Sequence, residues 1–369
     1  MGNKSRKMEN LVNNQLLFEK FSNKKVFITG HTGFKGTWLS ALLYKLNAKV
    51  KGYALSPKTN QNLFDIVNEN ERICESIIHD IRDIGKLREE LLVFKPDYIF
   101  HLAAQPLVRY SYKEPVETFE VNAMGTTYLL DAIRFLEGKC TIIIITTDKV
   151  YHNNESEKAY HEEDQLGGYD PYSSSKAMAE LVTNSYRNSY FNPDHFDTHQ
   201  KSVATARAGN VIGGGDWSDD RIIPDIIKAL SSDEPIVVRN PNSVRPWQHV
   251  LEPLCGYLLL AAKLAEDPKG ISGAWNFGPW PEDQLTVLEL VNMAISSWGS
   301  GSIQVNREAA AAHEAGLLKL NISKAVKSLS WKPILNAETA INWTLDWYKQ
   351  GVVNRKKYTF HQIEEYLTK

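Results

Sequence analysis

Cysteine is scarce in this sequence, which has Cys74, Cys140 and Cys255 among 369 residues. Their number is odd and they lie far apart, so we predict neither a disulfide framework nor a Cys-x-x-Cys metal site. His, Cys, Asp and Glu show no cluster with metal-ligand spacing, and we therefore expect no metal. This cysteine usage fits a reducing compartment and favours a cytoplasmic protein.

Long apolar runs are also missing, because no segment approaches the roughly 20 residues that a membrane-spanning helix needs. The first 25 residues are polar and of mixed charge, without the apolar stretch of a signal peptide. The formal net charge is only −2, from 42 Lys and Arg against 44 Asp and Glu. We therefore expect no membrane partner and no nucleic-acid partner.

What the sequence does contain is a regular alternation of short β-branched segments with segments of helical periodicity. Strands are predicted at 25–29, 49–55, 73–79, 98–103, 141–147 and 203–207, and helices at 37–46, 84–94, 115–135 and 173–191. The strand at 141–147 holds four consecutive isoleucines, typical of a strand buried on both faces. This alternation predicts an α/β fold with a doubly wound, Rossmann-type parallel sheet.

Three parts of the chain are expected. Residues 1–24 form a lead-in whose asparagines weaken it as a helix. Residues 25–210 form a dinucleotide-binding Rossmann domain. Residues 211–369, which prolines interrupt repeatedly, form a smaller substrate-binding lobe that is interleaved with the first domain.

A glycine-rich turn follows the first predicted strand and opens the first predicted helix, with glycines at positions 30, 33 and 36. The first glycine permits the tight turn, the second lets the backbone approach a pyrophosphate, and the third lets helix and strand pack closely. The helix N-terminus then offers free amides to phosphate. The predicted cofactor-binding residues of this turn are Gly30, Thr32, Gly33, Phe34, Lys35 and Gly36.

The end of the second predicted strand departs from the usual dinucleotide pattern. It holds no acid for the ribose hydroxyls, whereas Ser56 and Lys58 would tolerate a 2′-phosphate, so NADP stands as an alternative to NAD. Asp80, after the third strand, either accepts from the adenine amine or caps a turn, and both interpretations remain open.

Two segments carry candidate catalytic groups. Thr147, Asp148 and Lys149 follow the isoleucine-rich strand, at the sheet edge where α/β proteins bind ligands. Tyr172 and Lys176 share one helix face, one turn apart. We expect the ammonium to lower the pKa of the phenol toward neutrality and make it a usable base. A Tyr-x-x-x-Lys pair alone is commonly a surface pair, but the strand end and the glycine turn favour catalysis.

These features together resemble the extended short-chain dehydrogenases. The segments that carry the resemblance are the glycine turn, 101–105, 122–126, 147–149 and 172–176. The resemblance spans roughly residues 24–350, and it implies that the cofactor is also contacted by Asp80, Ile81, Leu102, Ala103, Gln105, Tyr172 and Lys176.

Within that family, four segments resemble the CDP-glucose 4,6-dehydratases: 30–38, 105–111, 206–217 and 245–249. The resemblance implies conversion of CDP-D-glucose to CDP-4-keto-6-deoxy-D-glucose and water in deoxysugar biosynthesis, with tightly bound NAD⁺. It implies that Tyr172 takes the proton of the 4-hydroxyl and that Lys176 holds the phenolate and the nicotinamide ribose. It also implies that Thr147 hydrogen-bonds the 4-oxygen and that Asp148 protonates the 6-hydroxyl so that it leaves as water. The hydride taken from C4 returns to C6.

The C5 base is open. Related dTDP-glucose dehydratases carry an acid after the aspartate, whereas this chain has Lys149. Lys149 either removes the C5 proton, which requires it to be partly neutral, or stabilises the enolate while another group takes the proton.

For the nucleotide sugar, the candidate contacts are Arg109, Asn210, Arg221 and Arg245, because arginine binds diphosphate in a bidentate manner. The family resemblance implies a homodimer or homotetramer built on the helices at 115–135 and 173–191. Two rival functions remain. One is an epimerase, decarboxylase or dehydratase for another nucleotide sugar on the same scaffold. The other is a non-catalytic dinucleotide-binding protein.

Overall fold

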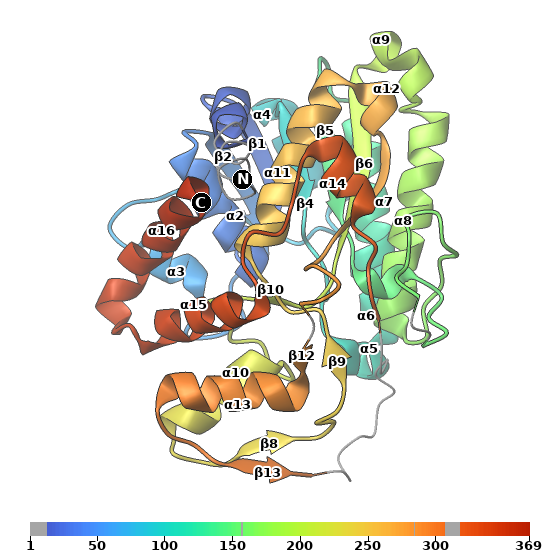
Figure 1. The fold of residues 1–369 in the computed structure, drawn as a ribbon. Helices are drawn as coiled ribbons and strands as arrows, with labels where there is room; N and C mark the ends of the chain where they lie inside the picture. The colour runs from blue at the N-terminus through green and yellow to red at the C-terminus, as the bar shows by residue number, and fades with distance from the viewer. Residues whose placement is uncertain (1–12, 156–157, 284, 307–317) are drawn as a thin grey trace, which may run out of the picture.

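The computed structural model describes residues 13–155, 158–283, 285–306 and 318–369. At its centre lies a seven-stranded sheet whose strands are all parallel (Figure 1). In spatial order they are β3 (Glu75–Ile78), β2 (Lys49–Ala54), β1 (Lys25–Thr29), β4 (Tyr98–His101), β5 (Cys140–Ile145), β6 (Lys201–Ala208) and β11 (Gly273–Phe277). The predicted doubly wound α/β fold is confirmed.

Strand β5 shows why the sheet is buried on both sides. All six of its residues are buried. Ile143 and Ile145 pack into the core on one face, and Ile142 and Ile144 pack into the core on the other. Helices α2 (Phe34–Lys45) and α11 (Leu251–Glu266) cover the first face, and the second is covered by α4 (Ile84–Phe94), α7 (Gly125–Ile133) and α8 (Pro171–Ser189).

The strand order reverses at β1, which pairs with β2 on one side and with β4 on the other. A crevice opens at the carboxyl ends of the strands at such a switch point, and ligands bind there. We therefore expect a ligand to bind beside the residues that follow β1, β4 and β5.

The predicted helix at 115–135 is an almost continuous helical stretch with an irregularity inside it. It consists of α6 (Pro115–Phe119), a π-helical turn η1 (Glu120–Met124) and α7, and it is preceded by the short α5 (Val108–Lys113). A π-turn inside a helix is frequently found at functional sites. Here it carries Asn122, whose side chain reaches the pocket loop described below.

The second half of the chain adds a smaller group of elements, most of them drawn in yellow and orange in the lower part of Figure 1. They are α10 (Ile222–Ser231), α13 (Val287–Trp298) and the strand pairs β7 (Val211–Ile212) with β10 (Gln248–His249), β8 (Ile236–Val238) with β13 (Ile303–Val305), and β9 (Val244–Arg245) with β12 (Leu285–Thr286). Because β11 and α11 pack with the central sheet, this half does not stand apart, and the boundary at residue 210 stays a prediction.

The other elements complete the layers. They are α3 (Leu63–Asn68), η2 (Asp148–Val150), η3 (Pro193–His195), α9 (Phe196–His199), α12 (Pro268–Ile271), α14 (Ser323–Leu329), α15 (Ala337–Lys349) and α16 (Val352–Thr368). None of the helices in the described part of the chain has the length and apolar character of a bilayer-spanning segment.

The lead-in differs from expectation. Residues 13–21 are helical although asparagine weakens helices, while 1–12 lie outside the described residues. Leu17 and Phe21 are buried in the core, and the Phe21 ring centroid lies 4.6 Å from that of Tyr98. The expected weakness is therefore wrong, because burial of the apolar face outweighs low propensity.

Candidate active site

A pocket of about 980 Å³ lies at the carboxyl ends of β1, β4, β5 and β6. Every residue that we predicted as catalytic, cofactor-binding or substrate-binding lines it, although these residues come from distant parts of the sequence. Their individual roles stay predictions. No group of three or more His, Cys, Asp and Glu side chains that could hold a metal ion was found among the described residues.

The glycine turn has the geometry of a phosphate cradle. Gly30 has φ +79°, and a Cβ there would lie 2.7 Å from the Ala103 nitrogen. A Cβ on Gly36 would lie 2.1 Å from the Gly30 oxygen, so close packing of strand and helix requires glycine. Gly33 is the N-cap of α2, and the first residues of that helix line the pocket. This arrangement fits the diphosphate of a dinucleotide.

At the far end of the pocket, Asp80 is already held by Arg82. The guanidinium lies 2.6 Å from Asp80 Oδ2, and the Arg82 amide donates to Oδ1 at 2.9 Å. These contacts lower the pKa of Asp80. The carboxylate therefore stabilises a turn, as one of the two interpretations had it, while still lining the pocket beside Ile81.

Asn122 of the π-helical turn η1 holds the loop after β4 in place. Asn122 accepts from the Gln105 amide at 2.8 Å and donates to the Gln105 carbonyl at 3.1 Å and to Ser175 at 2.8 Å. The Gln105 side chain bonds Leu107 and Thr118 instead of extending freely into the pocket. Gln105 thus shapes the wall that Leu102 and Ala103 continue.

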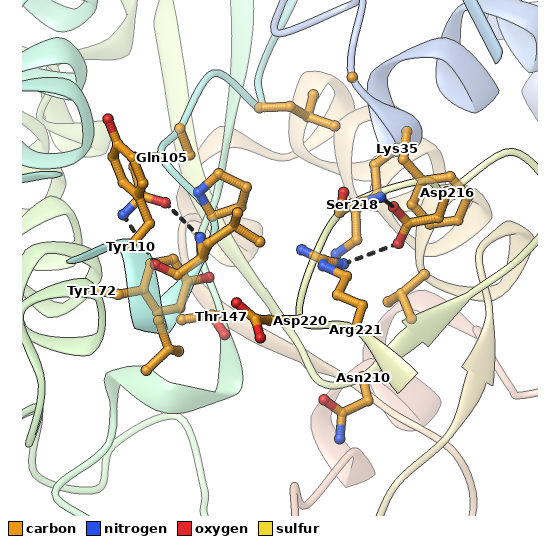
Figure 2. Close-up of a pocket in the computed structure, with 18 of the residues that line it drawn as sticks. Lys35, Gln105, Tyr110, Thr147, Tyr172, Asn210, Asp216, Ser218, Asp220 and Arg221 are labelled. Atoms are coloured by element: carbon orange, nitrogen blue, oxygen red, sulfur yellow. Dashed lines mark hydrogen bonds and ion pairs between the residues drawn. The ribbon is translucent and has the colours of Figure 1, made fainter. Parts of the chain in front are cut away.

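The catalytic candidates meet where β5 ends. The Thr147 hydroxyl donates to Asp148 Oδ1 at 2.9 Å and accepts from the Lys149 amide at 3.4 Å. Asp148 is buried, and Gly209 leaves room for it, since a Cβ there would lie 3.1 Å from Asp148 Oδ2. Lys149 follows in the 3₁₀ turn η2 and is half-buried. Figure 2 shows Thr147 beside Tyr172.

Helix α8 presents Tyr172 and Lys176 because its start is firmly capped. Asp170 accepts from the Ser173 amide at 2.9 Å and from the Ser173 hydroxyl at 2.6 Å, and Pro171 occupies the first turn. The Lys176 ammonium donates to the Ile145 carbonyl at 3.2 Å. Tyrosine and lysine therefore both reach the end of β5.

The expected pKa of Tyr172 is wrong in direction. Burial raises the pKa of the phenol to about 12, against lowering contributions from the Thr147 hydrogen bond and the Arg221 charge. Burial also lowers the pKa of Lys176 to about 8. The sequence reasoning assumed that the ammonium is the dominant influence, whereas desolvation is larger.

Lys35 also lines this pocket. Burial lowers its pKa to about 7, and the positive charge of Arg221 acts in the same direction, while the negative charge of Asp148 opposes them. In Figure 2 it lies near Asp216 and Arg221, across the pocket from Tyr172. The charges of Arg221 and Asp148 therefore act on Lys35, which its place in a phosphate-binding turn did not suggest.

The predicted substrate contacts come from both sides of the pocket: Arg221 lies across it from Tyr172 (Figure 2), whereas Arg109 belongs to α5, which packs against α8. Arg221 is paired with Asp216 at 3.5 Å, and Arg109 is paired with Asp220 at 3.1 Å. Arg245 lies in β9, and the Asn210 carbonyl accepts from the Gln248 amide.

Two features of this pocket were not predicted. Arg239 lies 3.7 Å from Asp220 and lines the pocket. The glycine run 213–215 packs under the C-terminal helices, because a Cβ on Gly214 would lie 2.0 Å from Trp347. The sequence signal was present in the triple glycine, but its packing partner lies more than 130 residues away.

Histidines near the site have structural roles. His101 is buried and bonds Thr29 at 2.7 Å and Thr126 at 3.1 Å. His249 is buried between Trp38 and Trp343. Burial lowers the pKa of each to about 3, so both are neutral at physiological pH.

Comparison with known proteins places this geometry in context. The chain is 46% identical to CDP-glucose 4,6-dehydratase of Salmonella typhimurium (strain LT2), over 90% of this chain and 92% of the relative. Among solved structures, UDP-glucuronic acid 4-epimerase from Bacillus cereus, in complex with UDP-glucuronic acid and NAD, has a TM-score of 0.74 at 23% identity. That match covers 88% of this chain and 99% of the epimerase.

A second solved structure is dTDP-glucose 4,6-dehydratase from Bacillus anthracis in complex with NAD. Its TM-score is 0.73 at 20% identity, over 88% of this chain and 96% of that one. These two structural matches establish the fold. The family model described as GDP-mannose 4,6 dehydratase matches residues 27–344. The chain therefore belongs to the GDP-mannose 4,6 dehydratase family.

Proposed function

We propose that this protein converts CDP-D-glucose to CDP-4-keto-6-deoxy-D-glucose and water. The observation that carries the proposal is the position of Tyr172 beside Thr147, whose hydroxyl donates to the buried Asp148 at the end of β5. An epimerase would use the phenol but has no need of an acid beside it. The 46% identity to a CDP-glucose 4,6-dehydratase supports the cytidine nucleotide.

NAD⁺ is the proposed cofactor, and bound there it accepts a hydride from C4 of the sugar and returns it to C6. The turn at Gly30, Gly33 and Gly36 would hold its diphosphate at the N-terminus of α2. The related structures in complex with NAD support this choice over NADP.

In the first step, Tyr172 removes the proton of the sugar 4-hydroxyl. The phenolate must form in a buried site, where the pKa is about 12 in the structure. The positive charge of Arg221 already lowers that pKa. A substrate bound beside Arg221 and Thr147 would be aligned for proton transfer. A ketone at C4 then acidifies the C5–H bond.

In the second step, Asp148 acts as the acid. The C5–H proton leaves to a base, the C6–O bond breaks, and the carboxyl proton of Asp148 joins the departing hydroxide as water. Thr147 donates to Asp148 and lies beside Tyr172 (Figure 2), so we infer that it relays the proton gained by the phenolate back to the carboxylate. The proton at C5 is then restored when C6 receives its hydride.

Lys149 is the proposed partner of the C5 step, either as the base or as the cation that stabilises the enolate. It lines the pocket one residue from Asp148. The variant Lys149→Met separates the two roles. If Lys149 is the base, exchange of the C5 hydrogen with deuterated solvent is lost; near-normal exchange removes it from that role.

The sugar nucleotide would lie across the pocket, with its diphosphate among Arg221, Arg245 and Arg109 and with Asn210 beside it. Arginine offers a planar, bidentate donor for this purpose. Arg109 and Arg221 are now held by aspartates, which a diphosphate would have to replace.

We also propose a homodimer, or a homotetramer of two such dimers, formed through the outer face of α6, η1, α7 and α8. Exposed apolar side chains gather on this face, where solvent contact is unfavourable: Val116, Met124, Phe135, Met178, Leu181 and Tyr190. The variant Leu181→Glu should shift the mass measured by light scattering to that of the monomer. An unchanged mass would move the interface elsewhere. A cytoplasmic location stays a prediction from composition.

The function is tested by offering CDP-, dTDP-, GDP- and UDP-glucose to the purified protein. The 4-keto product develops a near-ultraviolet absorbance in base, and we expect it with CDP-glucose first. Turnover of only another nucleotide sugar would keep the reaction and change the substrate. Absence of product from all four would overturn the proposal.

A further inference from the structure

Helix α8 touches the end of β5 at three successive levels. Tyr172 lies beside Thr147 (Figure 2), Lys176 bonds the Ile145 carbonyl at 3.2 Å, and Glu180 accepts from the Thr146 hydroxyl at 2.5 Å. The three α8 residues are four positions apart, so they lie on one face of the helix. The first two belong to the proposed catalytic machinery, whereas the third has no role in it.

Glu180 is a buried carboxylate, and both of its oxygens accept hydrogen bonds. Its other contacts are the Thr205 hydroxyl at 2.7 Å and the Arg207 guanidinium at 2.9 and 3.0 Å, in a bidentate pair. Both side chains are almost completely buried, at 4% and 3% exposure. Arg207 also donates to Tyr151 at 2.8 Å and to the Glu162 carbonyl at 3.0 Å. A network this complete and this dry holds its members in one geometry.

Glu180 also acts on Lys176 through its negative charge. Burial lowers the pKa of Lys35, which lines the pocket, and of His101, which is buried at the end of β4, and the charge of Lys176 acts in the same direction on both. Burial lowers the pKa of Lys176 itself, and the negative charge of Glu180 is the influence that raises it. Glu180 is in turn offset by Arg207 and, further along α8, by Arg187.

We infer that the Glu180–Arg207 pair is a positioning device of the active site, which sets the position of α8 against β5 and holds a carboxylate one helical turn from Lys176. This inference rests on the proposed function, because that function requires the phenol of Tyr172 and the charge of Lys176. A buried ion pair could instead stabilise the fold alone, so the test must report on Lys176.

The first variant is Glu180→Gln, which keeps the shape and removes the charge. We expect the alkaline limb of the kcat profile to move down by about one pH unit or more, because an opposite charge near an ionisable group is lost. At pH 6.5 kcat should stay within about threefold of the parent protein. Adding Arg207→Gln should return the limb part of the way. The exposed Glu163→Gln is the matched control for the charge change.

A second pair of variants tests position without touching charge. Thr146→Val and Thr205→Val each remove one buried hydroxyl that donates to Glu180, from β5 and from β6 respectively. If the pair aligns α8 with the catalytic strand, Thr146→Val lowers kcat several-fold more than Thr205→Val, with KM unchanged. Equal effects of the two variants would overturn the positioning role.

The charge of Lys176 can be read without turnover. Competitive acetylation with acetic anhydride at a series of pH values, quantified by mass spectrometry, gives the titration of Lys176 itself. A downward shift in Glu180→Gln supports the inference even if CDP-glucose proves not to be the substrate. An unshifted titration together with an unshifted kcat limb contradicts it. If Glu180→Gln does not fold, the two threonine variants decide.

Discussion

The two walls of the pocket are built on different principles. On the β5–α8 wall, Thr147, Asp148, Tyr172 and Lys176 are buried, and Thr147 and Lys176 are hydrogen-bonded to Asp148 and to the Ile145 carbonyl. Across the pocket Arg221 is 34% exposed, and Arg109, which reaches Asp220 from α5, is 29% exposed. Solvated ion pairs contribute little to stability and can exchange partners. The groups that do chemistry are thus fixed in advance, whereas the groups that bind charge remain free to adapt.

The largest effect should come from Tyr172→Phe, on the rigid wall. It removes only the phenolic oxygen, so we expect kcat to fall about 10³-fold while the protein stays folded, since a positioned base contributes about 10² to 10⁴. Steady-state kinetics with CDP-glucose measures this. Tyr186→Phe, on the same helix but outside the pocket, is the control and should match the parent protein. A loss below tenfold would argue against Tyr172 as the base.

Asp148→Asn should separate the two steps on that wall. The variant keeps the shape but has no proton to expel the C6 hydroxyl, so we expect overall turnover to fall about 10²-fold or more. Oxidation at C4 should persist. The measurement is the absorbance of reduced nicotinamide at the start of the reaction, which we expect to build up. Normal product formation would show that Asp148 is not the acid.

On the adaptable wall, Arg221→Met should act mainly on binding. Loss of a charge-assisted contact of about 1.5–3 kcal/mol corresponds to a rise in KM of roughly 10- to 100-fold. We expect kcat to fall by less than KM rises, because Arg221 is only one of the influences on the pKa of Tyr172 and the Thr147–Asp148 hydrogen bond remains. If kcat falls and KM does not, the contrast between the walls fails at this residue.

The smallest effect concerns stability in acid. The pKa of His249 is about 3 in the folded protein, below its ordinary value of 6.5, so folding favours the neutral ring. Stability is therefore complete above pH 6.5 and is lost as the pH falls toward 3, by about 1.4 kcal/mol per pH unit for each such histidine. His249→Phe should flatten the decline by that amount between pH 6 and 4 in urea titrations. An unchanged slope would mean that His249 is not held neutral.

Much of the fold followed from local patterns. The isoleucine run of β5 and the glycine spacing after β1 are properties of consecutive residues, and both appear in the structure as predicted. The Thr147 and Tyr172 segments could be brought together because parallel strands end at one edge.

What the sequence could not supply depends on packing between distant segments. Glu180 and Arg207 are separated by 27 residues, and only the contact of α8 with β6 pairs them. The pKa of Tyr172 was expected to fall, but the depth of its burial, which raises it, is set by the whole pocket wall. Likewise, Arg239 and Asp220 meet only because β8 and the turn before α10 fold together.

The most direct test of the account follows the hydrogens of the sugar. When the protein acts on CDP-glucose deuterated at C4, in ordinary water, mass and NMR spectra should show the deuterium at C6 of the 4-keto-6-deoxy product. In deuterated water, unlabelled substrate should instead gain deuterium at C5. A product whose deuterium has been lost to solvent or remains at C4, or no product at all, would contradict the proposed reaction.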